Sequence, residues 1–339
     1  MWGKTQTPPY SAAQIPYGKL THISHSFLAI KSDGTLSIAP TLLEPALISN
    51  AHAAGVKVLI SIGGADEPQS PAFATVAKNK ALRKKFARNL RRFITENGYD
   101  GADVDWEVPN APVDTQPCIL LMKALRAELP RPKFLLSMAI PANPAHYGTG
   151  FDVPALAPIL DFINIMTYDF HGPWGNHAGH NSPMILNPAD PGSEGSLTTS
   201  MDLFEKTYGV PPQKLNFGTA FYGYDFEGVK ALWDACNCVK TTTSVNYGTA
   251  IKQRIDRQGW KSHSDDVAQA PYLLYEGSEH GPGFVTYDDA NSTAAKTKLI
   301  LGARKMGGVF MWEITADYDG SSQDLLDAMY RAFTAANTK

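Results

Sequence analysis

The chain has 339 residues, of which 43% are hydrophobic and 19% are charged, and this is the composition of a soluble globular protein long enough for one large core. Its formal net charge of -3 gives no electrostatic reason to expect binding to nucleic acid or to an anionic membrane surface. No apolar run approaches the roughly 18 residues that span a bilayer, and no signal peptide is recognised at the start.

Apolar, β-branched runs alternate with helical patterns along the chain. The runs predict strands at 20–30, 57–64, 101–107, 133–141, 161–169, 214–224 and 307–314. The segments between them predict helices at 42–54, 81–96, 119–129, 197–208, 293–305 and 323–335. Seven such strands in about 300 residues favour an α/β fold of the (β/α)8 TIM-barrel type over an open doubly wound sheet. A dinucleotide-binding fold is disfavoured because no G-x-G-x-x-G sequence opens a helix.

Residues 225–282 interrupt this alternation. The segment is too long for a loop between a strand and a helix and too patterned for disorder, so we expect a small α+β insertion at the rim of the barrel. The expected organisation is a TIM-barrel catalytic domain of residues 1–224 and 283–339 that carries an inserted domain of residues 225–282.

Three carboxylic acids occupy every second position at the end of the strand expected at 101–107, namely Asp103, Asp105 and Glu107. Because successive side chains of a strand alternate between faces, the three point the same way, roughly 6–7 Å apart along the strand. Acids at that spacing in a partly buried site cannot all ionise at low cost, so their titrations couple and at least one pKa rises. A carboxylic acid that stays protonated near neutral pH is what general acid catalysis needs.

Four further strand ends carry polar or aromatic groups. They are Ser61-Ile62-Gly63-Gly64, Met166-Thr167-Tyr168-Asp169, Phe221-Tyr222-Gly223-Tyr224 and Met311-Trp312-Glu313. Active sites of (β/α)8 barrels lie at the C-terminal ends of the strands. These groups and the acidic row are therefore expected to contribute to one site.

The segment from Asp100 to Glu107 resembles the signature of glycoside hydrolase family 18, the chitinases. The other strand-end motifs and the segment from Phe284 to Asp289 follow in the family's order, which extends the resemblance to about residues 19–330. The resemblance implies retaining hydrolysis of β-1,4-linked N-acetylglucosamine in chitin and chito-oligosaccharides, assisted by the substrate's own N-acetyl group through an oxazolinium ion. It also implies a secreted monomer whose partner is the saccharide and which needs no cofactor or metal.

The resemblance assigns a role to each motif residue. Glu107 would be the general acid that protonates the glycosidic oxygen. Asp105 would hold the acetamido N–H, Asp103 would share a proton with Asp105, and Tyr168 would orient the acetamido carbonyl. Trp312 would form the apolar floor of the sugar site. The other residues assigned to substrate binding are Asp169, Tyr222, Met166, Trp106 and Trp174. The supporting residues are Ser61, Gly63, Gly64 and Asp100.

Several of these residues keep a second interpretation. Trp174 either stacks on a sugar or anchors its own loop. The group Ser61, Gly63 and Gly64 either supports Asp103 and permits close packing or forms a plain turn. The basic residues between positions 83 and 92 alternate with an apolar stripe, which indicates the solvated face of an amphipathic helix rather than a nucleic-acid site.

The histidines and cysteines give no metal or disulfide framework. Three histidines follow the strand expected at 161–169, namely His171, His177 and His180. Their spacing fits no zinc motif and no carboxylate is recognised to complete a set, so we expect them in the loop or at the rim of the cleft. The chain has three cysteines, Cys118, Cys236 and Cys238, and the last two are too close in sequence for an easy bridge.

The sequence departs from the family pattern in three places. The chain begins where the family's first strand would finish, so that strand is expected to be missing or truncated, with Trp2 as its remnant. Ala65 stands where an aromatic residue is common, and Tyr224 stands where an arginine is frequent.

Two other functions remain to be weighed. An endo-β-N-acetylglucosaminidase acting on N-glycans usually lacks the insertion that is expected at residues 225–282. A non-catalytic, chitin-binding lectin of the chitinase type typically loses the acid at the position of Glu107.

Overall fold

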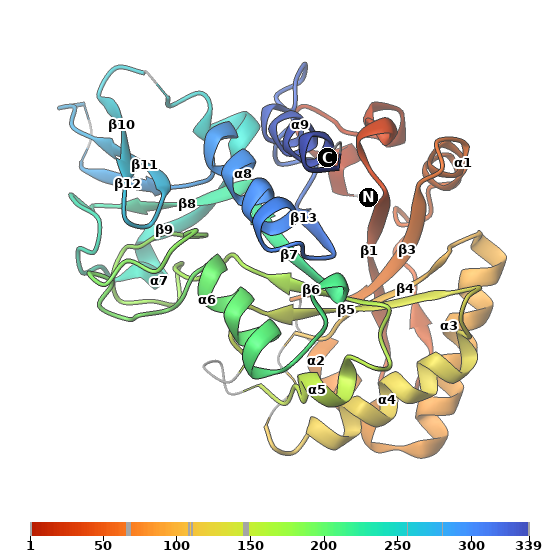
Figure 1. Cartoon of the computed structure of the whole chain (residues 1–339). Helices are drawn as coiled ribbons and strands as arrows, with labels where there is room; N and C mark the ends of the chain where they lie inside the picture. Colours follow the sequence, from red (N-terminus) through yellow and green to blue (C-terminus); the bar gives the residue numbers. More distant parts are fainter. Residues whose placement is uncertain are drawn as a thin grey trace. The chain divides into compact units, whose positions relative to one another are not determined.

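The computed structural model describes residues 2–65, 69–107, 109, 111–144, 149–255, 257–279 and 281–337 (Figure 1). Its internal contacts divide the chain into two compact units. The first unit comprises Met1–Asn164 and Tyr208–Leu215, and the second comprises Ile165–Thr207 and Asn216–Lys339. These boundaries differ from those of the expected barrel (residues 1–224 and 283–339) and insertion (residues 225–282). The expected division stays a prediction.

The first unit is built on a sheet of mainly parallel strands. The strands are β1 (His22–Ile30), β2 (Leu36–Ser37), β3 (Lys57–Gly63), β4 (Gly101–Asp105), β5 (Leu135–Pro141) and β6 (Phe162–Met166). They lie in the order β6-β5-β4-β3-β1-β2. The pairs β1–β3, β3–β4 and β4–β5 are parallel, whereas β1 and β2 pair antiparallel. All of β4 is buried, and so is β3 after its first residue, as expected for parallel strands covered on both faces.

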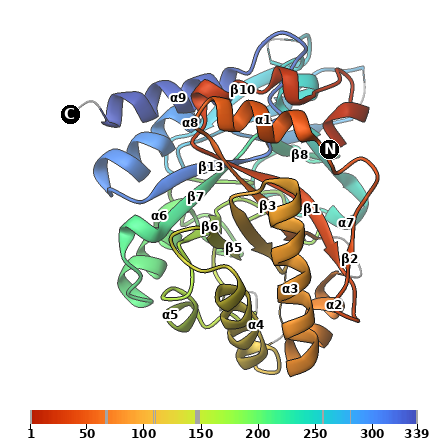
Figure 2. The ribbon, with the colours of Figure 1, turned by 90° about the vertical axis from the view of Figure 1, so that its right-hand side faces the viewer.

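Helices cover this sheet. They are α1 (Pro45–Ala53), α2 (Gln69–Lys78), α3 (Lys80–Asn97), α4 (Thr115–Glu128) and α5 (Val153–Leu156). The α3 helix begins where the side chain of Asn79 accepts two backbone N–H groups and ends at Gly98, whose φ of 78° suits glycine. Phe86 and Leu90 are buried on one face of α3, which confirms the apolar stripe expected there. Figure 2 shows α3 and α4 side by side outside the sheet.

The second unit holds a parallel strand pair and a separate antiparallel sheet. The pair is β7 (Leu215–Ala220) with β13 (Gly308–Trp312). The sheet has the order β10-β11-β12-β8-β9 and consists of β8 (Tyr222–Glu227), β9 (Thr242–Asn246), β10 (Trp260–Asp265), β11 (Ala270–Tyr275) and β12 (Gly283–Thr286) (Figure 1). This sheet contains the segment expected as an insertion and extends past both of its ends. The helices of this unit are α6 (Leu197–Asp202), α7 (Cys238–Thr241), α8 (Ala290–Thr297) and α9 (Asp324–Asn337).

The single strand expected at 214–224 is wrong, because the chain passes there from one sheet to the other. The backbone N–H of Phe221 donates to the Trp312 carbonyl (2.8 Å) at the end of β13. The carbonyl of Phe221 accepts from the Tyr247 N–H (3.1 Å), beside β9. Phe221 itself is fully buried, so it fixes the point at which β7 ends and β8 begins.

The other six expected strands are confirmed, with ends that shift by up to three residues. The expected helices are confirmed as well, except that the turns after α6 and α8 continue as short π-helical segments. Among the described helices, α2, α5 and α7 lie outside every expected helix range. Residues 2–21 form three 3-10 turns, and the expected loss of a first strand stays a prediction.

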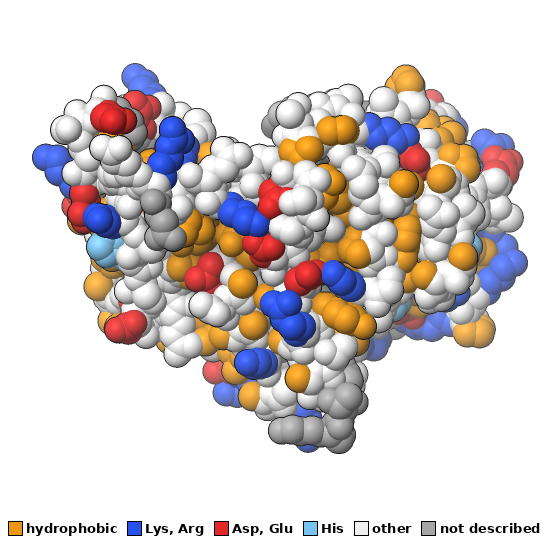
Figure 3. All heavy atoms as spheres, turned by 90° about the horizontal axis from the view of Figure 1, so that it is seen from above, with side chains coloured by type: hydrophobic (Ala, Val, Ile, Leu, Met, Phe, Trp, Pro, Cys, Tyr) orange, Lys and Arg blue, Asp and Glu red, His pale blue; other side chains and the backbone are white. Residues whose placement is uncertain are grey.

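The surface carries interspersed charges. On the face shown in Figure 3, acidic and basic side chains alternate rather than gather by sign, in keeping with the small net charge. Within the part of the chain that the structure describes, no helix combines the length and the apolar character that crossing a membrane requires.

Candidate active site

The expected site residues fall into two groups, one in each unit. The acidic row and its neighbours belong to the first unit, at the C-terminal ends of β3 and β4. The aromatic group, around Tyr168 and Trp312, belongs to the second unit.

The register of the parallel sheet places polar side chains beside Asp103. Asp103 lies opposite Ser61 of β3 and opposite Ser137 of β5, so the three residues form one row across three strands. In the next row of the sheet, Val104 lies between Ile62 and Met138, and all three side chains are buried and apolar. The expected alternation of acids on one face and apolar residues on the other is therefore confirmed within β4.

Asp103 is buried and receives three side-chain hydrogen bonds. The Ser61 hydroxyl donates to its Oδ2 (3.0 Å), and the Ser137 hydroxyl (2.5 Å) and the Asn164 amide (3.2 Å) donate to its Oδ1. Burial raises the pKa of Asp103, whereas the three donors act in the opposite direction. The net effect is a raised pKa of Asp103, because the effect of burial exceeds that of the donors.

Asp105 is the more strongly perturbed acid of the pair. It is 6% exposed, and its Oδ1 has no hydrogen-bond partner among the described residues. Burial, followed by the charges of Glu107 and Asp103, raises the pKa of Asp105 well above its ordinary value. The expectation that at least one acid of the row has a raised pKa is confirmed.

Glu107 lies beyond the end of the strand. The β4 strand ends at Asp105 rather than at Glu107, and the side chain of Glu107 is half-buried. Trp106, which was assigned to substrate binding, is 1% exposed, stacks on Phe73 at a centroid distance of 5.3 Å and donates to the Ser70 hydroxyl (2.9 Å). A ring with both faces covered offers no surface to a sugar, so the structure gives Trp106 a packing role.

Gly63 permits the close approach of β3 to β4 at Asp105. Its φ is 115°, and a Cβ at this position would lie 2.0 Å from the Asp105 carbonyl oxygen. That carbonyl accepts the N–H of Gly64 (2.9 Å). Asp100 instead lies at the other end of β4, where its carboxylate accepts from the Val58 N–H (2.9 Å) and fixes the start of the strand pair.

In the second unit, Tyr168 is held by aromatic contacts. It is 7% exposed and makes edge-to-face contacts with Tyr222 and Phe310, at centroid distances of 6.0 and 6.2 Å. Met166 and Trp312 are half-buried and pack against the same cluster. Trp312 is the last residue of β13, and its peptide bond to Glu313 is cis.

Asp169 accepts hydrogen bonds from two tyrosines at once. The hydroxyls of Tyr222 and Tyr224 both donate to its Oδ1, the second at 2.8 Å. Burial raises the pKa of Asp169, and the two hydroxyls partly offset that effect. Asp169 has a φ of 62°, and its N–H donates to the side-chain oxygen of Asn181 (2.9 Å).

Sequence reasoning missed Asn181 as a member of this group, and it missed the hydrogen bond from Tyr224 to Asp169. Tyr224 lies in a strand-end motif expected to contribute to the site, but it received no role of its own, although its spacing of two residues from Tyr222 within a strand already places both on one face. Trp174 lies at the edge of the group, 57% exposed, with its ring edge-on to Tyr224 at 5.7 Å. Neither interpretation of Trp174 is tested by this contact.

The expectation that no carboxylate accompanies the histidines is wrong. The Oδ1 of Asp190 lies 3.2 Å from the Nε2 of His171 and 3.3 Å from the Nε2 of His177. His180 lies apart from this group, with its Nε2 3.0 Å from Asp265. Asp190 follows His171 by 19 residues in a loop, a separation that no short zinc motif contains.

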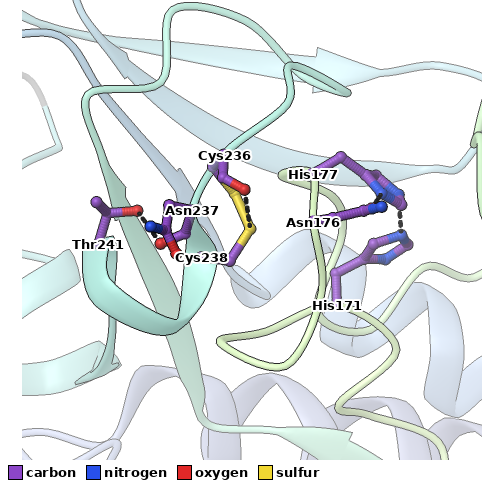
Figure 4. Close-up of a disulfide and its surroundings, with 7 residues drawn as sticks. All are labelled: His171, Asn176, His177, Cys236, Asn237, Cys238 and Thr241. Atoms are coloured by element: carbon purple, nitrogen blue, oxygen red, sulfur yellow. Dashed lines mark hydrogen bonds between the residues drawn. A yellow bond between two sulfur atoms is a disulfide. The ribbon is translucent and has the colours of Figure 1, made fainter.

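The expectation about the cysteines is also wrong, because Cys236 and Cys238 form a disulfide (Figure 4). The chain turns at Asn237, which caps α7, and this turn brings the two Cα atoms to 5.0 Å. That separation lies within the usual range for a disulfide. Cys118 is a buried free thiol.

The sequence profile described as "Glycosyl hydrolases family 18" matches residues 1–317. The chain belongs to this family. Its expected identity as a glycoside hydrolase of family 18 is therefore confirmed, and so is its assignment as an enzyme.

Relatives with curated names are chitinases. Chitinase 1 of Aphanocladium album is 28% identical over 92% of this chain and 79% of its own length. Chitinase A1 of Niallia circulans is 29% identical over 80% of this chain, and the match spans only 42% of that longer relative.

Solved structures of the family share the fold. A Group IV chitinase of Ostrinia furnacalis in complex with allosamidin has a TM-score of 0.86 at 24% identity, covering 99% of this chain and 97% of that one. A family 18 N-acetylglucosaminidase from Paenibacillus barengoltzii has a TM-score of 0.83 at 27% identity, covering 96% of each chain. These likenesses confirm a TIM-barrel-like α/β fold.

Proposed function

We propose that this protein hydrolyses β-1,4 linkages between N-acetylglucosamine residues in chitin and chito-oligosaccharides, with retention of anomeric configuration. The observation that carries the proposal is the buried pair Asp103 and Asp105 on β4, followed by the half-buried Glu107 two residues beyond the end of that strand. Two coupled acids behind a third, more accessible acid form a proton reservoir and a proton donor in one row.

The hydrogen bonds around the pair decide where its proton resides. Three donors surround Asp103, whereas the Oδ1 of Asp105 has no hydrogen-bond partner among the residues that the structure describes. Because hydrogen bonds to a carboxylate favour its charged form, a single proton shared by the pair lies mainly on Asp105. When a substrate N–H approaches Asp105, this proton can pass to Asp103 and leave Asp105 as the acceptor.

The reaction would proceed in two steps. In the first, Glu107 gives its proton to the glycosidic oxygen, the bond from that oxygen to the anomeric carbon breaks, and the acetamido carbonyl oxygen bonds to the anomeric carbon to give an oxazolinium ion. In the second, the Glu107 carboxylate takes a proton from water, whose oxygen attacks the anomeric carbon. The bond between that carbon and the acetamido oxygen breaks, which opens the oxazolinium ring. Two inversions at one carbon amount to retention.

The resemblance to the family assigns sugar binding to the aromatic group of the second unit. Tyr168 would donate a hydrogen bond to the acetamido oxygen and so hold it for attack. Trp312 would present its ring to the C–H face of the pyranose. Asp169, with Tyr222 and Tyr224, would bind hydroxyl groups of the sugar through a carboxylate whose orientation the two tyrosines fix.

Hydrolysis of chitotetraose by the intact chain, with products identified by mass and by anomeric NMR signals, tests the proposal. We expect β-anomeric products from the wild type and a loss of about 10³-fold or more in kcat for Glu107→Gln, which removes the proton donor. Glu96→Gln, at an exposed position on α3, is the matched control and should keep wild-type activity.

Other outcomes would point to other functions. Binding of chito-oligosaccharides without cleavage by the wild type would contradict hydrolysis and indicate a lectin. Release of N-glycans without cleavage of chitotetraose would indicate an endo-β-N-acetylglucosaminidase. Equal activity of the wild type and Glu107→Gln would remove Glu107 from the mechanism.

We also propose that the protein acts outside the cell. Disulfides form and persist in oxidising compartments, and the bond between Cys236 and Cys238 is of this kind. A polymer too large to enter cells is, in addition, accessible only to a secreted enzyme. Protein recovered from the culture medium can be alkylated and analysed by mass spectrometry. Before reduction, Cys236 and Cys238 should both escape alkylation, and after reduction both should be alkylated.

A further inference from the structure

Three buried side chains of the second unit point their polar atoms at one another. The Nε2 atoms of His171 and His177 lie 3.2 Å apart, and the Oδ1 of Asp190 lies 3.2 Å from the first and 3.3 Å from the second. All three residues are at most 8% exposed. Figure 4 shows the two histidine rings approaching through their nitrogens, close to the disulfide between Cys236 and Cys238.

The neighbours of the two histidines fix their tautomers. The Nδ1 of His171 lies 3.0 Å from the backbone carbonyl of His180, and a carbonyl can only accept, so this nitrogen carries a proton. The Nδ1 of His177 lies 2.8 Å from the side-chain oxygen of Asn176 and carries a proton for the same reason. In both neutral rings the Nε2 atom therefore carries a lone pair and no proton. Both lone pairs face the Asp190 carboxylate.

Protons alone satisfy this arrangement poorly. A second proton on one histidine could bond to Asp190, but the lone pair of the other histidine would still face the carboxylate oxygen at 3.2 or 3.3 Å. A cation placed between the three atoms is attracted by all of them. Neutral histidines whose far nitrogen donates to an oxygen are also the usual form of metal-bound histidines.

The distances fit a small tetrahedral ion. Zinc bonds of 2.0–2.2 Å to nitrogen and oxygen, at tetrahedral angles, place neighbouring ligand atoms about 3.3–3.5 Å apart. The three separations of 3.2, 3.2 and 3.3 Å require almost no movement to reach that geometry. Two histidines and one carboxylate also form a donor set that zinc commonly takes, with water as the fourth ligand.

The carboxylate is held in place independently of the histidines. The N–H of Gly192 donates to Asp190 Oδ1 (3.0 Å), and the N–H of Glu194 donates to Oδ2 (3.3 Å). The ring of Trp233 covers His171 at a centroid distance of 5.5 Å. Supporting hydrogen bonds of this kind are what keeps metal ligands oriented before the ion binds.

We propose that His171, His177 and Asp190 form a zinc-binding site that closes the loop following β6. The ion would join the start of this loop to residue 190, across the segment that includes Asn181, whose side chain holds the backbone of Asp169. Its role would be structural: to hold the loop between the sugar-binding motif at 166–169 and α6. The site is separate from the residues proposed for hydrolysis.

The test is zinc binding by the intact, untagged chain after treatment with a chelator. Calorimetric titration with Zn²⁺ should show one site with a micromolar or lower Kd, and saturating Zn²⁺ should raise Tm by roughly 5 °C. Asp190→Asn and His177→Gln should each weaken binding by at least about 100-fold and abolish the rise in Tm. His263→Gln, a histidine of β10 outside the cluster, should bind as the wild type does.

A measurement on the wild type covers the case in which a variant fails to fold. Co²⁺ in a tetrahedral site of nitrogen and oxygen ligands has intense visible bands, and addition of one equivalent of Zn²⁺ should remove them. No stoichiometric binding of either ion to the wild type would overturn the proposal, and so would equal binding by folded Asp190→Asn. Because neither measurement uses saccharide hydrolysis, this result is independent of the proposed activity.

Discussion

A buried lysine in the second unit offers the sharpest test of the energetics inferred from the structure. Lys296 of α8 is 0% exposed, and its ammonium lies 2.7 Å from each carboxylate oxygen of Asp288 and 2.8 Å from the hydroxyl of Ser182. The Ser182 hydroxyl in turn donates to the Thr167 carbonyl (2.7 Å), next to Tyr168. The ion pair therefore stabilises both the unit and the backbone of the sugar-binding motif.

The change Lys296→Met removes the cation but leaves the Asp288 carboxylate buried. The Ser292 hydroxyl (2.7 Å) then remains as its side-chain donor, and one neutral donor does not compensate a buried charge. Breaking a buried pair in this way costs about 3–5 kcal/mol, which corresponds to an increase of about 10²- to 10⁴-fold in the equilibrium constant for unfolding. The double variant Lys296→Met/Asp288→Asn removes the uncompensated charge, so it should recover about 1–3 kcal/mol of that loss.

Urea denaturation, followed by tryptophan fluorescence, measures these differences. For a slope near 3 kcal/mol/M, the midpoint of Lys296→Met should fall by about 1 M or more. Lys298→Met is the matched control, because Lys298 is exposed two residues further along, and its effect should stay within about 0.5 kcal/mol. Equal midpoints for Lys296→Met and Lys298→Met would refute the reasoning, as would a double variant less stable than Lys296→Met.

Three further predictions concern pH and packing. Burial lowers the pKa of His25 from 6.5 to about 4. Because the unfolded chain therefore takes up the proton at a higher pH than the folded chain, roughly 3 kcal/mol of stability should be lost as pH falls from 6.5 to 4. His25→Leu should abolish this part of the dependence of Tm on pH. Gly63→Ala, whose Cβ would clash with a backbone carbonyl at 2.0 Å, should cost at least about 2 kcal/mol in urea denaturation, whereas Gly55→Ala, also at positive φ but in open space, should cost only about 1. Tyr224→Phe removes a hydrogen-bond donor to Asp169 and should raise the pKa of that carboxyl further. The acidic limb of the pH profile of kcat/KM should therefore move to higher pH. An acidic limb at the wild-type position would show that Asp169 does not titrate in the reaction.

The parallel strands could be predicted because their signal is local. Each is a short run of apolar residues bounded by polar ones, and burial on both faces makes that run continuous. The ends of β7 and β8 could not be predicted in this way. The chain leaves one sheet at Phe221 because of hydrogen bonds to Trp312 and Tyr247, which are 91 and 26 residues away in sequence. Similarly, α2 has ten residues with Pro71 near its start, so neither its length nor its composition separated it from a loop.

The histidine cluster shows the same limit in the site. The positions of His171 and His177 were visible in the sequence, but nothing in the spacing singles out Asp190 among the chain's carboxylates. The turn that aims Asp190 at the histidines is made by backbone N–H groups of Gly192 and Glu194. Such contacts depend on the folded loop and have no residue-type signature. The close disulfide between Cys236 and Cys238 similarly depends on the turn at Asn237 rather than on the spacing alone.

The acidic row shows how far a correct motif reaches and where it stops. The spacing of Asp103, Asp105 and Glu107 predicts coupled titration, but it treats the first two acids alike. Their difference comes from other strands: the register of β3 and β5 brings Ser61 and Ser137 to Asp103, while the partner of Asp105 in β3 is Gly63, which has no side chain. A glycine is required there by the close approach of the backbones, so the same residue that permits the packing also withholds a donor from Asp105. The asymmetry that favours the proton on Asp105 is therefore a consequence of sheet register, and it should change if a donor is supplied to Asp105 rather than if the acids themselves are respaced.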